Sequence, residues 1–360
     1  MSDSLRVNFF GSAPFVLPIL QSIHASRGRP LQELALEQLA RIPLSTQEER
    51  HVTASLLTNR YLQDPLELSF VVTQPDRQNR GRLVRNDIAQ FCIDNNIELF
   101  QPYKMRASVE GYLSQTPADI GVVAAYGQIL PMSVIEAQRY GLVNWHPSLL
   151  PEYRGPTPMQ AALRDQRTHT GLSWIKVDEK MDAGDIYWQS EYRIKPEDDF
   201  ATLAEYFATL GIKQWALVLA LRILDREQVA GEYAPRRQKF SEATFCGLLE
   251  KSDKFIDLAN SNAAEVYAHY QAYVGFPGTV YESEYFGEEV KIVKANGVVG
   301  TGEFEKLRQE SSSFGIFGEW VRVSTSKQVK TLLKTKDGFV DVQRVGLSSG
   351  KQITLSGYQF

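Results

Sequence analysis

Two polar residues end an otherwise apolar run at residues 142–146, where the sequence reads LVNWH. Asn144 and His146 are two positions apart, and side chains in a β-strand alternate between faces, so both point to the same side. A neutral imidazole can donate or accept a proton near pH 7. A carboxamide N–H can stabilise an oxygen that becomes negative in a transition state. The pair therefore suits attack on a carbonyl by a nucleophile that the protein itself does not supply.

The same spacing also fits a structural role, in which His146 is a hydrogen-bonded core histidine and Asn144 caps the strand end. A second motif favours chemistry. Residues 177–189 read VDEKMDAGDIYWQ and carry three aspartates near Gly184, which permits unusual backbone angles. A carboxylate beside the imidazole would fix its tautomer, although such a loop alone predicts only a turn. The aspartates are Asp178, Asp182 and Asp185.

The sequence lacks the motifs that other catalytic mechanisms need. Ser148 has no G-x-S-x-G context, and neither Cys92 nor Cys246 is next to a histidine. The opening FFGSAPF matches neither a dinucleotide fingerprint nor a Walker loop. We therefore expect no covalent nucleophile, no metal and no NAD. The remaining histidines, which form no metal-binding spacing, are His24, His51, His169 and His269.

Alternating strand-like and helical runs predict the scaffold of these residues. Apolar strands that alternate with helices indicate an α/β, doubly wound parallel sheet, whose strand ends carry functional groups. We expect one long helix at 198–224 to close this domain. The predicted strands are 5–12, 66–76, 118–131, 142–146 and 170–178, and the predicted helices between them are 14–24, 86–96, 132–141 and 159–166.

The remaining segments predict a second domain, a linker and an insert. Residues 226–242 are polar and contain Gly231 and Pro235, which is typical of a linker between domains 1–225 and 243–360. From about residue 278, short β-rich runs separated by turns indicate a small barrel or sandwich. Residues 26–65 interrupt the alternation with two helical patterns, which we interpret as an excursion packed on the sheet edge rather than a functional insert.

Composition narrows the class of protein. The chain has 360 residues, of which 43% are hydrophobic, and a formal net charge of −4. An RNA contact must therefore come from a local basic patch. Two distant cysteines fit a reducing compartment. The sequence shows no signal peptide and no run of about 18 apolar residues, so we predict a cytoplasmic protein that is not in a membrane.

The quoted motifs have a familiar pattern. NWHPSLLPEYRGPTPMQAAL, followed by TGLSWIKVDEKMDAGDIYWQ, resembles the folate-dependent formyltransferase family, which carries an Asn-x-His pair, an S-L-L-P turn and a downstream Asp. VVTQPDRQNRGR is similar to a segment of the methionyl-tRNA formyltransferases, as are VAAYGQILP and the C-terminal sequence. The likeness covers nearly the whole chain, and residues 26–65 are the clear departure.

The resemblance implies a fold, a reaction and a set of residues. The fold is a Rossmann-like formyltransferase domain joined to a C-terminal OB-like barrel that contacts tRNA. The reaction moves the formyl group of 10-formyltetrahydrofolate to the α-amino group of methionyl-initiator tRNA, in translation initiation. Asn144, His146 and Asp182 are the implied catalytic set. Ser148, Leu149, Leu150 and Pro151 would border the folate.

We expect tRNA as a partner, and binding of tRNA needs a local basic surface. We also expect the enzyme to be a monomer. Residues 76–86, DRQNRGRLVRN, place four arginines around a glycine, in a loop that fits either phosphate contacts or plain solvation. The runner-up function is an N-formyltransferase acting on a nucleotide-linked amino sugar. A formate-releasing hydrolase and a non-catalytic RNA-binding protein are the further alternatives. The arginines are Arg77, Arg80, Arg82 and Arg85.

Overall fold

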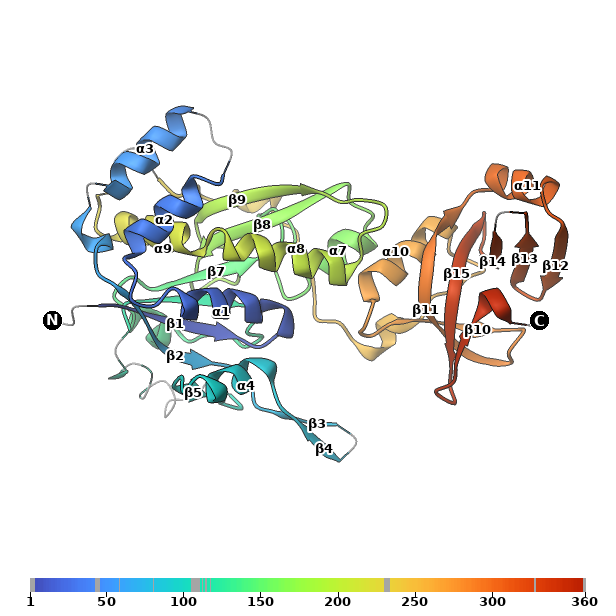
Figure 1. The fold of residues 1–360 in the computed structure, drawn as a ribbon, viewed down its shortest axis with the longest axis horizontal. Helices are drawn as coiled ribbons and strands as arrows, with labels where there is room; N and C mark the ends of the chain where they lie inside the picture. The colour runs from blue at the N-terminus through green and yellow to red at the C-terminus, as the bar shows by residue number, and fades with distance from the viewer. Residues whose placement is uncertain are drawn as a thin grey trace. The chain divides into compact units, whose positions relative to one another are not determined.

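The computed structural model describes residues 4–42, 46–57, 59–79, 81–104, 111, 113, 115–116, 118–229, 234–326 and 328–358. Its first part is built on a seven-stranded sheet, to which the predicted apolar strands contribute (Figure 1). In order across the sheet, the strands are β5 (Leu99–Phe100), β2 (Leu66–Val72), β1 (Leu5–Gly11), β6 (Ile120–Ala124), β7 (Leu142–His146), β8 (His169–Lys176) and β9 (Ile186–Arg193).

Five of these strands confirm the predicted parallel sheet. β5, β2, β1, β6 and β7 run parallel, and numbered along the chain they lie in the order 3-2-1-4-5 of a doubly wound fold. β8 differs, because it runs antiparallel to β7. The intervening helix α7 (Pro158–Arg164) has seven residues and spans only about 10 Å.

The side chains of β7 divide between two helical layers. A Cβ on Gly211 of α8 would lie 2.9 Å from the ring nitrogen of Trp145, so Trp145 faces that helix. Leu142 packs on the opposite face, in a cluster with α6. Asn144 and His146 share the face of Leu142. Helices described here are α1 (Leu17–Ala25), α2 (Leu31–Leu39), α3 (Thr46–Leu57), α4 (Asp87–Asp94), α6 (Met132–Glu136), α8 (Phe200–Ile212) and α9 (Trp215–Arg226).

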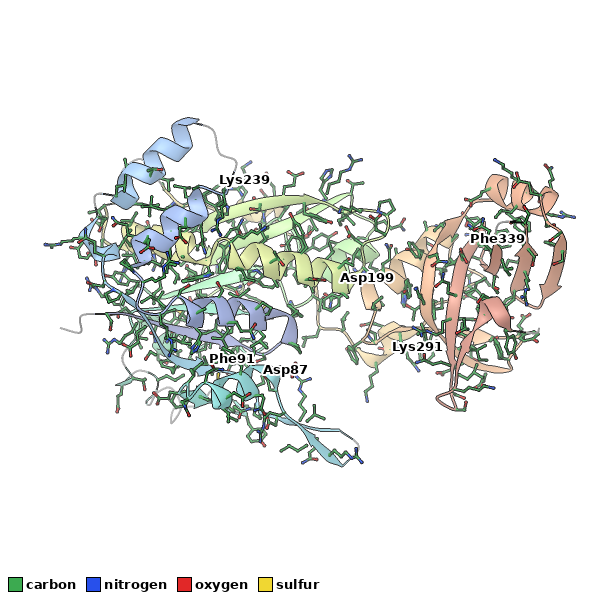
Figure 2. The ribbon with its side chains drawn as sticks, viewed as in Figure 1. Asp87, Phe91, Asp199, Lys239, Lys291 and Phe339 are labelled. Atoms are coloured by element: carbon green, nitrogen blue, oxygen red, sulfur yellow. The ribbon has the colours of Figure 1, made fainter. Side chains whose placement is uncertain are left out.

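Helix α4 begins at a side-chain cap and packs on α1. The side chain of Asn86 accepts hydrogen bonds from the backbone N–H groups of Ile88 and Ala89, at 2.9 and 3.4 Å. Phe91, one turn beyond Asp87 (Figure 2), places its ring 5.4 Å from that of His24 on α1, in an edge-on contact. These contacts fix the end of the arginine-bearing loop, which precedes α4.

The insert at residues 26–65 folds into the two predicted helices, but α2 packs on α9 (Figure 1) rather than on the sheet edge. Gln38 is buried and its Nε2 donates to the carbonyl of Ile212 at 2.9 Å. Its Oε1 accepts from the backbone N–H groups of Ala216 and Leu217, at 2.9 and 3.0 Å. One side chain therefore satisfies the end of α8 and the start of α9, whose backbone groups lack partners within their helices.

The prediction of one long helix at 198–224 is wrong. The structure has α8 and α9 instead, bent by 55°. Buried Gln214 stands between them and turns toward the sheet, where its Oε1 accepts from the ring nitrogen of Trp174 at 3.2 Å and its Nε2 donates to Oγ of Ser190 at 2.8 Å. No single described helix is long and apolar enough to cross a membrane, and α8 with α9 meets that test only as this bent pair.

The C-terminal part contains a second, antiparallel sheet, which curls around a buried apolar cluster. Tyr281 and Trp320 lie on strands that are not neighbours, yet their rings are 6.4 Å apart in that cluster. Glu319 accepts hydrogen bonds from Oγ of Ser283 and, at 3.0 Å, from the backbone N–H of Tyr285. This curling agrees with the predicted OB-like barrel. The sheet order is β10 (Thr279–Ser283), β11 (Glu288–Val299), β15 (Phe339–Leu347), β14 (Val329–Lys334), β13 (Trp320–Ser324) and β12 (Ser313–Phe317), with β16 (Gln352–Thr354) against β15; α10 (Ala263–Tyr273) and α11 (Thr301–Gln309) complete it.

The chain divides into two compact units, each of which is made of three separate stretches of the sequence. The first unit comprises residues 1–158, 171–192 and 204–246, and it contains the parallel sheet and the candidate site. It extends beyond residues 226–242, the segment that the sequence predicted as a linker. The second unit comprises residues 159–170, 193–203 and 247–360.

Candidate active site

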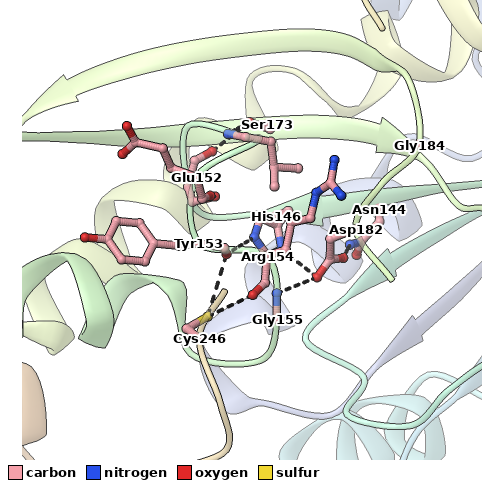
Figure 3. A network of polar contacts seen from close by, with 12 residues as sticks. Asn144, His146, Glu152, Tyr153, Arg154, Gly155, Ser173, Asp182, Gly184 and Cys246 are labelled. Atoms are coloured by element: carbon pink, nitrogen blue, oxygen red, sulfur yellow. Dashed lines mark hydrogen bonds and ion pairs between the residues drawn. The ribbon is translucent and has the colours of Figure 1, made fainter. Parts of the chain in front are cut away.

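β7 presents Asn144 and His146 at the carboxyl end of the parallel strands. Its backbone is held between β6 and β8. The ring nitrogen of Trp145 donates to the carbonyl of Phe207 at 3.2 Å, on the side of α8. Asn144 and His146 instead both approach Asp182 (Figure 3). The predicted alternation of faces along this strand is therefore confirmed.

The carboxylate of Asp182 joins the two β7 residues. Its Oδ1 accepts from Nδ2 of Asn144 at 3.1 Å, and its Oδ2 lies 3.6 Å from Nδ1 of His146. The same Oδ2 accepts from the backbone N–H of Gly155 at 2.9 Å. The side chains of Asp182 and His146 are only 13% and 4% exposed, so salt screens their interaction weakly. Asp178, by contrast, bonds to its own end of the loop.

Both ring nitrogens of His146 face an oxygen that can accept a hydrogen bond. Nε2 lies 2.9 Å from the carbonyl oxygen of Tyr153, and because a carbonyl only accepts, Nε2 carries the hydrogen in this contact. Nδ1 faces Asp182. Tyr153 and Asp182 have φ angles of 55° and 50°, a left-handed conformation that is uncommon for residues other than glycine and clusters at functional sites. Two loops therefore set the orientation of the imidazole.

The turn at Ser148–Pro151 contains a cis Leu150–Pro151 bond. Its polar backbone groups form hydrogen bonds with other parts of the protein. Ser148 and Leu150 are buried, and their backbone groups already have partners. Leu149 and Pro151 are half-buried, so they are the parts of this turn left to border a ligand. The internal bonds run from Ser148 Oγ to Glu152 O (2.7 Å), from Ser173 Oγ to Ser148 O (2.6 Å), from Leu150 N to Ser173 Oγ (3.1 Å) and from Gln189 Nε2 to Leu150 O (3.0 Å).

The arginine loop forms a two-stranded hairpin, β3 (Arg77–Asn79) and β4 (Arg82–Val84), that extends away from the sheet (Figure 1). Arg77 and Arg82 are exposed, and Arg77 donates to Oε1 of Gln74 at 3.0 Å. Arg85 is held at the base of the hairpin, where its Nε lies 3.5 Å from Oδ2 of Asp76. Arg80 lies outside the described residues. Among the described residues of the hairpin, none has a hydrogen bond or ion pair to Asn144, His146 or Asp182.

Residues 234–246, here called the strap, cross the loops of the candidate site, although their polar sequence predicted a linker. Arg236 and Ile186 exchange two backbone hydrogen bonds, at 2.8 and 2.9 Å. Farther along, the backbone N–H of Arg154 donates to the carbonyl of Thr244 at 2.9 Å. Sequence reasoning missed these residues, because bonds to distant backbone leave no periodicity or motif in the strap itself.

The described residues hold no cluster of three or more His, Cys, Asp or Glu side chains that could bind a metal ion. Both cysteines are thiols with raised pKa values. Burial raises the pKa of Cys92 to about 12 and also raises that of Cys246. A thiolate is the nucleophilic form of cysteine, so neither residue suits covalent catalysis. The cluster can instead supply an amide N–H, an imidazole and a carboxylate.

Known proteins are similar to this chain in sequence and in fold. A family model described as formyl transferase matches residues 44–221, and one described as formyl transferase, C-terminal domain, matches residues 248–359. The chain is similar to the methionyl-tRNA formyltransferase of Sulfurihydrogenibium sp. (strain YO3AOP1), with 31% identity over 288 residues that cover 79% of this chain and 86% of that protein. It is 27% identical to that of Caldicellulosiruptor saccharolyticus over 318 residues, 85% of this chain and 94% of that protein.

A solved structure agrees on the fold. The N-formyltransferase from Helicobacter canadensis, in complex with folinic acid and dTDP-3-aminofucose, matches with a TM-score of 0.56. The match covers 94% of this chain and 98% of that one. The sequence identity is 14%, so this likeness concerns the fold alone.

Proposed function

Because this chain belongs to the methionyl-tRNA formyltransferase family, we propose that Asn144, His146 and Asp182 carry its formyl transfer. The reaction takes the formyl group from 10-formyltetrahydrofolate and places it on the α-amino group of methionyl-initiator tRNA. The amine nitrogen attacks the formyl carbon, the bond from that carbon to N10 breaks, and N10 takes up a proton. Tetrahydrofolate and formylmethionyl-tRNA leave.

One observation carries the proposal: a single carboxylate contacts both polar side chains at the end of β7. Asp182 accepts from Asn144 at 3.1 Å and lies 3.6 Å from His146. The amide nitrogen of Asn144 carries two hydrogens. Asp182 takes one, which leaves the other for the oxygen that becomes negative when the amine attacks.

His146 is the proton-transfer group in this proposal. The attacking amine must be neutral, and an α-amino group with a pKa of about 7.7–8 is partly neutral at pH 7. After attack the nitrogen bears an extra proton, while N10 must gain one to leave. To pass that proton, the ring must carry its own hydrogen on Nδ1, toward Asp182, and turn a free Nε2 from the carbonyl of Tyr153 to the reacting groups. Asp182 keeps the ring aligned for this step.

Replacing Asp182 with asparagine tests the cluster. The change keeps the shape but removes an acceptor, so kcat should fall on the order of ten- to a hundredfold, the equivalent of one charge-assisted hydrogen bond. Formyl transfer to methionyl-tRNA measures it. Asp178→Asn is the matched control on the same loop, and it should stay within about twofold of wild type, as an exposed surface change does. Equal losses in both variants would refute a specific role for Asp182.

The turn at Ser148–Pro151 is proposed to border the folate. The half-buried Leu149 and Pro151 support contact with the ligand, whereas the buried Ser148 and Leu150 support the shape of the turn. The fold also occurs in the N-formyltransferase from Helicobacter canadensis, which was solved with folinic acid and dTDP-3-aminofucose. The relatives at 27–31% identity over most of this chain are methionyl-tRNA formyltransferases, and this favours a tRNA acceptor over a nucleotide-linked amino sugar. A cytoplasmic monomer stays a prediction.

The arginine hairpin is proposed to contact tRNA phosphates through Arg77, Arg80, Arg82 and Arg85. Exposed Arg77 and Arg82 can be tested together, as alanine variants. We expect a higher KM for methionyl-tRNA and a dependence on salt whose logarithmic slope falls by about 2, one for each lost phosphate contact. The KM for 10-formyltetrahydrofolate should not change. Arg27→Ala at the end of α1 is the control, and an unchanged salt slope in the double variant would exclude the hairpin from phosphate binding.

A further inference from the structure

The strap is fixed at both of its ends to loops of the active site. Near its start, Arg236 pairs with Ile186, just beyond the loop that carries Asp182. Near its end, Cys246 donates its backbone N–H to the carbonyl of Arg154 at 2.8 Å. The carbonyl of Cys246 comes so close to Gly155 that a Cβ there would lie 2.1 Å from it. The residues between Arg236 and Cys246 are therefore held against the loops that carry Asp182 and Arg154.

Gln238 lies in this stretch of the strap and uses its whole side-chain amide. Its Nε2 donates to the carbonyl of Asp182 at 2.9 Å and to that of Gly184 at 2.7 Å. Its Oε1 accepts from Nε and Nη2 of Arg154, at 3.1 and 2.8 Å. One glutamine thus joins the strap, the Asp182 loop and the segment after β7.

The Asp182 loop needs such a clamp. Asp182 has a φ of 50°, a conformation that persists only where the surroundings impose it. Two residues on, a Cβ at Gly184 would lie 1.9 Å from the carbonyl of Lys176, so the loop folds tightly onto β8. Asn144 and Gly155 hold the carboxylate of Asp182, and Gln238 holds its backbone.

Arg154 gives the clamp its second function. Its guanidinium is buried at 2% exposure, and burial lowers the pKa of this arginine while the charge of Asp182 opposes that shift. The ring of Phe240, also on the strap, lies 5.4 Å from the guanidinium carbon. Oε1 of Gln238 carries no full charge, so the positive charge of Arg154 is not cancelled by its partner on the strap and still interacts with that of Asp182.

We propose that Gln238 is a positioning residue for formyl transfer, which holds Asp182 in the conformation that aligns His146 and Asn144. The inference rests on the proposed catalytic role of Asp182. Gln238 does not touch the reacting atoms; it acts through the loop. The strap is in this view a component of the active site, and its sequence contributes to the rate.

A double-mutant cycle tests the inference. Gln238→Glu keeps the size and an acceptor for Arg154, removes the donor to the two carbonyls and adds a negative charge that repels them. We expect kcat to fall roughly tenfold, as for one lost hydrogen bond, with both KM values unchanged. If Gln238 acts through Asp182, then adding Gln238→Glu to Asp182→Asn should cost less than about twofold more. Multiplied losses in the double variant, or a wild-type rate for Gln238→Glu, would overturn the proposal.

Two further variants show whether a lower rate comes from the lost hydrogen bonds of Gln238 or from a loss of folding. The rate of Asp182→Asn tests the premise that Asp182 is catalytic. Gln238→Met preserves length without hydrogen bonds and replaces Gln238→Glu in the cycle if that variant unfolds below the assay temperature. Ser241→Ala, at an exposed position of the strap, should leave kcat unchanged. A normal rate in Asp182→Asn would remove the catalytic proposal itself, whereas a slow Asp182→Asn beside a normal Gln238→Glu would remove only the role of Gln238.

Discussion

Replacing His146 with alanine is expected to lower kcat for formyl transfer at least ~100-fold, the usual contribution of a positioned acid–base group. The imidazole is 4% exposed and bonds to the carbonyl of Tyr153, and the alanine side chain has no group that can donate or accept a proton in its place. The KM for methionyl-tRNA should change little, because the proposed phosphate contacts come from the arginine hairpin and not from His146. Single-turnover formylation of methionyl-tRNA, which separates chemistry from product release, is the measurement.

His169→Ala is the matched control for this experiment. His169 is exposed on β8, and its Nδ1 lies 3.0 Å from Oγ1 of Thr168. Its loss should stay within about twofold of the wild-type rate. Thermal unfolding of both variants shows whether the fold survives the change. Full activity in a folded His146→Ala variant would assign the histidine to structure, the alternative that its strand-end position also allows.

Replacing Asn144 with alanine is expected to lower kcat by about 10²–10³, the loss measured when one donor to a developing oxyanion is removed. The KM for 10-formyltetrahydrofolate should stay nearly constant, because the second N–H of the amide is needed only when the oxygen becomes negative. The variant also removes one of the hydrogen bonds to Asp182. The measurement is steady-state formylation with each substrate varied in turn.

Asn95→Ala serves as the control for a lost asparagine, since Asn95 is exposed at the end of α4 and its Nδ2 donates to the carbonyl of Phe91 at 2.9 Å. It should retain the wild-type kcat. A second comparison is Asn144→Ala in combination with Asp182→Asn. If both residues serve one transition state, their losses should not multiply. Raised KM with unchanged kcat in Asn144→Ala would mean that the amide binds substrate rather than the transition state.

Local pattern predicted much of the scaffold, because each strand or helix reveals its own period. Most positions of β1, β2, β6 and β7 are apolar and buried, as parallel strands covered on both faces require. Helix 198–224 shows where this reasoning ends. Its apolar period continues through Gln214, and the break comes from bonds to Trp174 and Ser190 on the sheet, which no local pattern contains.

Part of the candidate site could likewise be predicted from local pattern, and part of it could not. Asn144 and His146 could be assigned to one face of a strand by the two-residue period alone, and Pro147 marked where that strand stops. Residue spacing could not choose among the three aspartates of the following loop. The choice of Asp182 came from family resemblance, and in the structure it follows from the antiparallel return of β8 and the left-handed backbone at Asp182.

By itself, the sequence determined that a parallel α/β sheet ends in an amide and an imidazole, since periodicity and side-chain chemistry are local properties. Only the tertiary structure decided which carboxylate meets them, how Arg77 and Arg85 are held, and that the strap bonds to the loop of Asp182. Hydrogen bonds such as those of Gln38 and Gln238 join residues more than 50 positions apart. Their partners are chosen when the chain packs, so their energy leaves no signal in the neighbouring sequence.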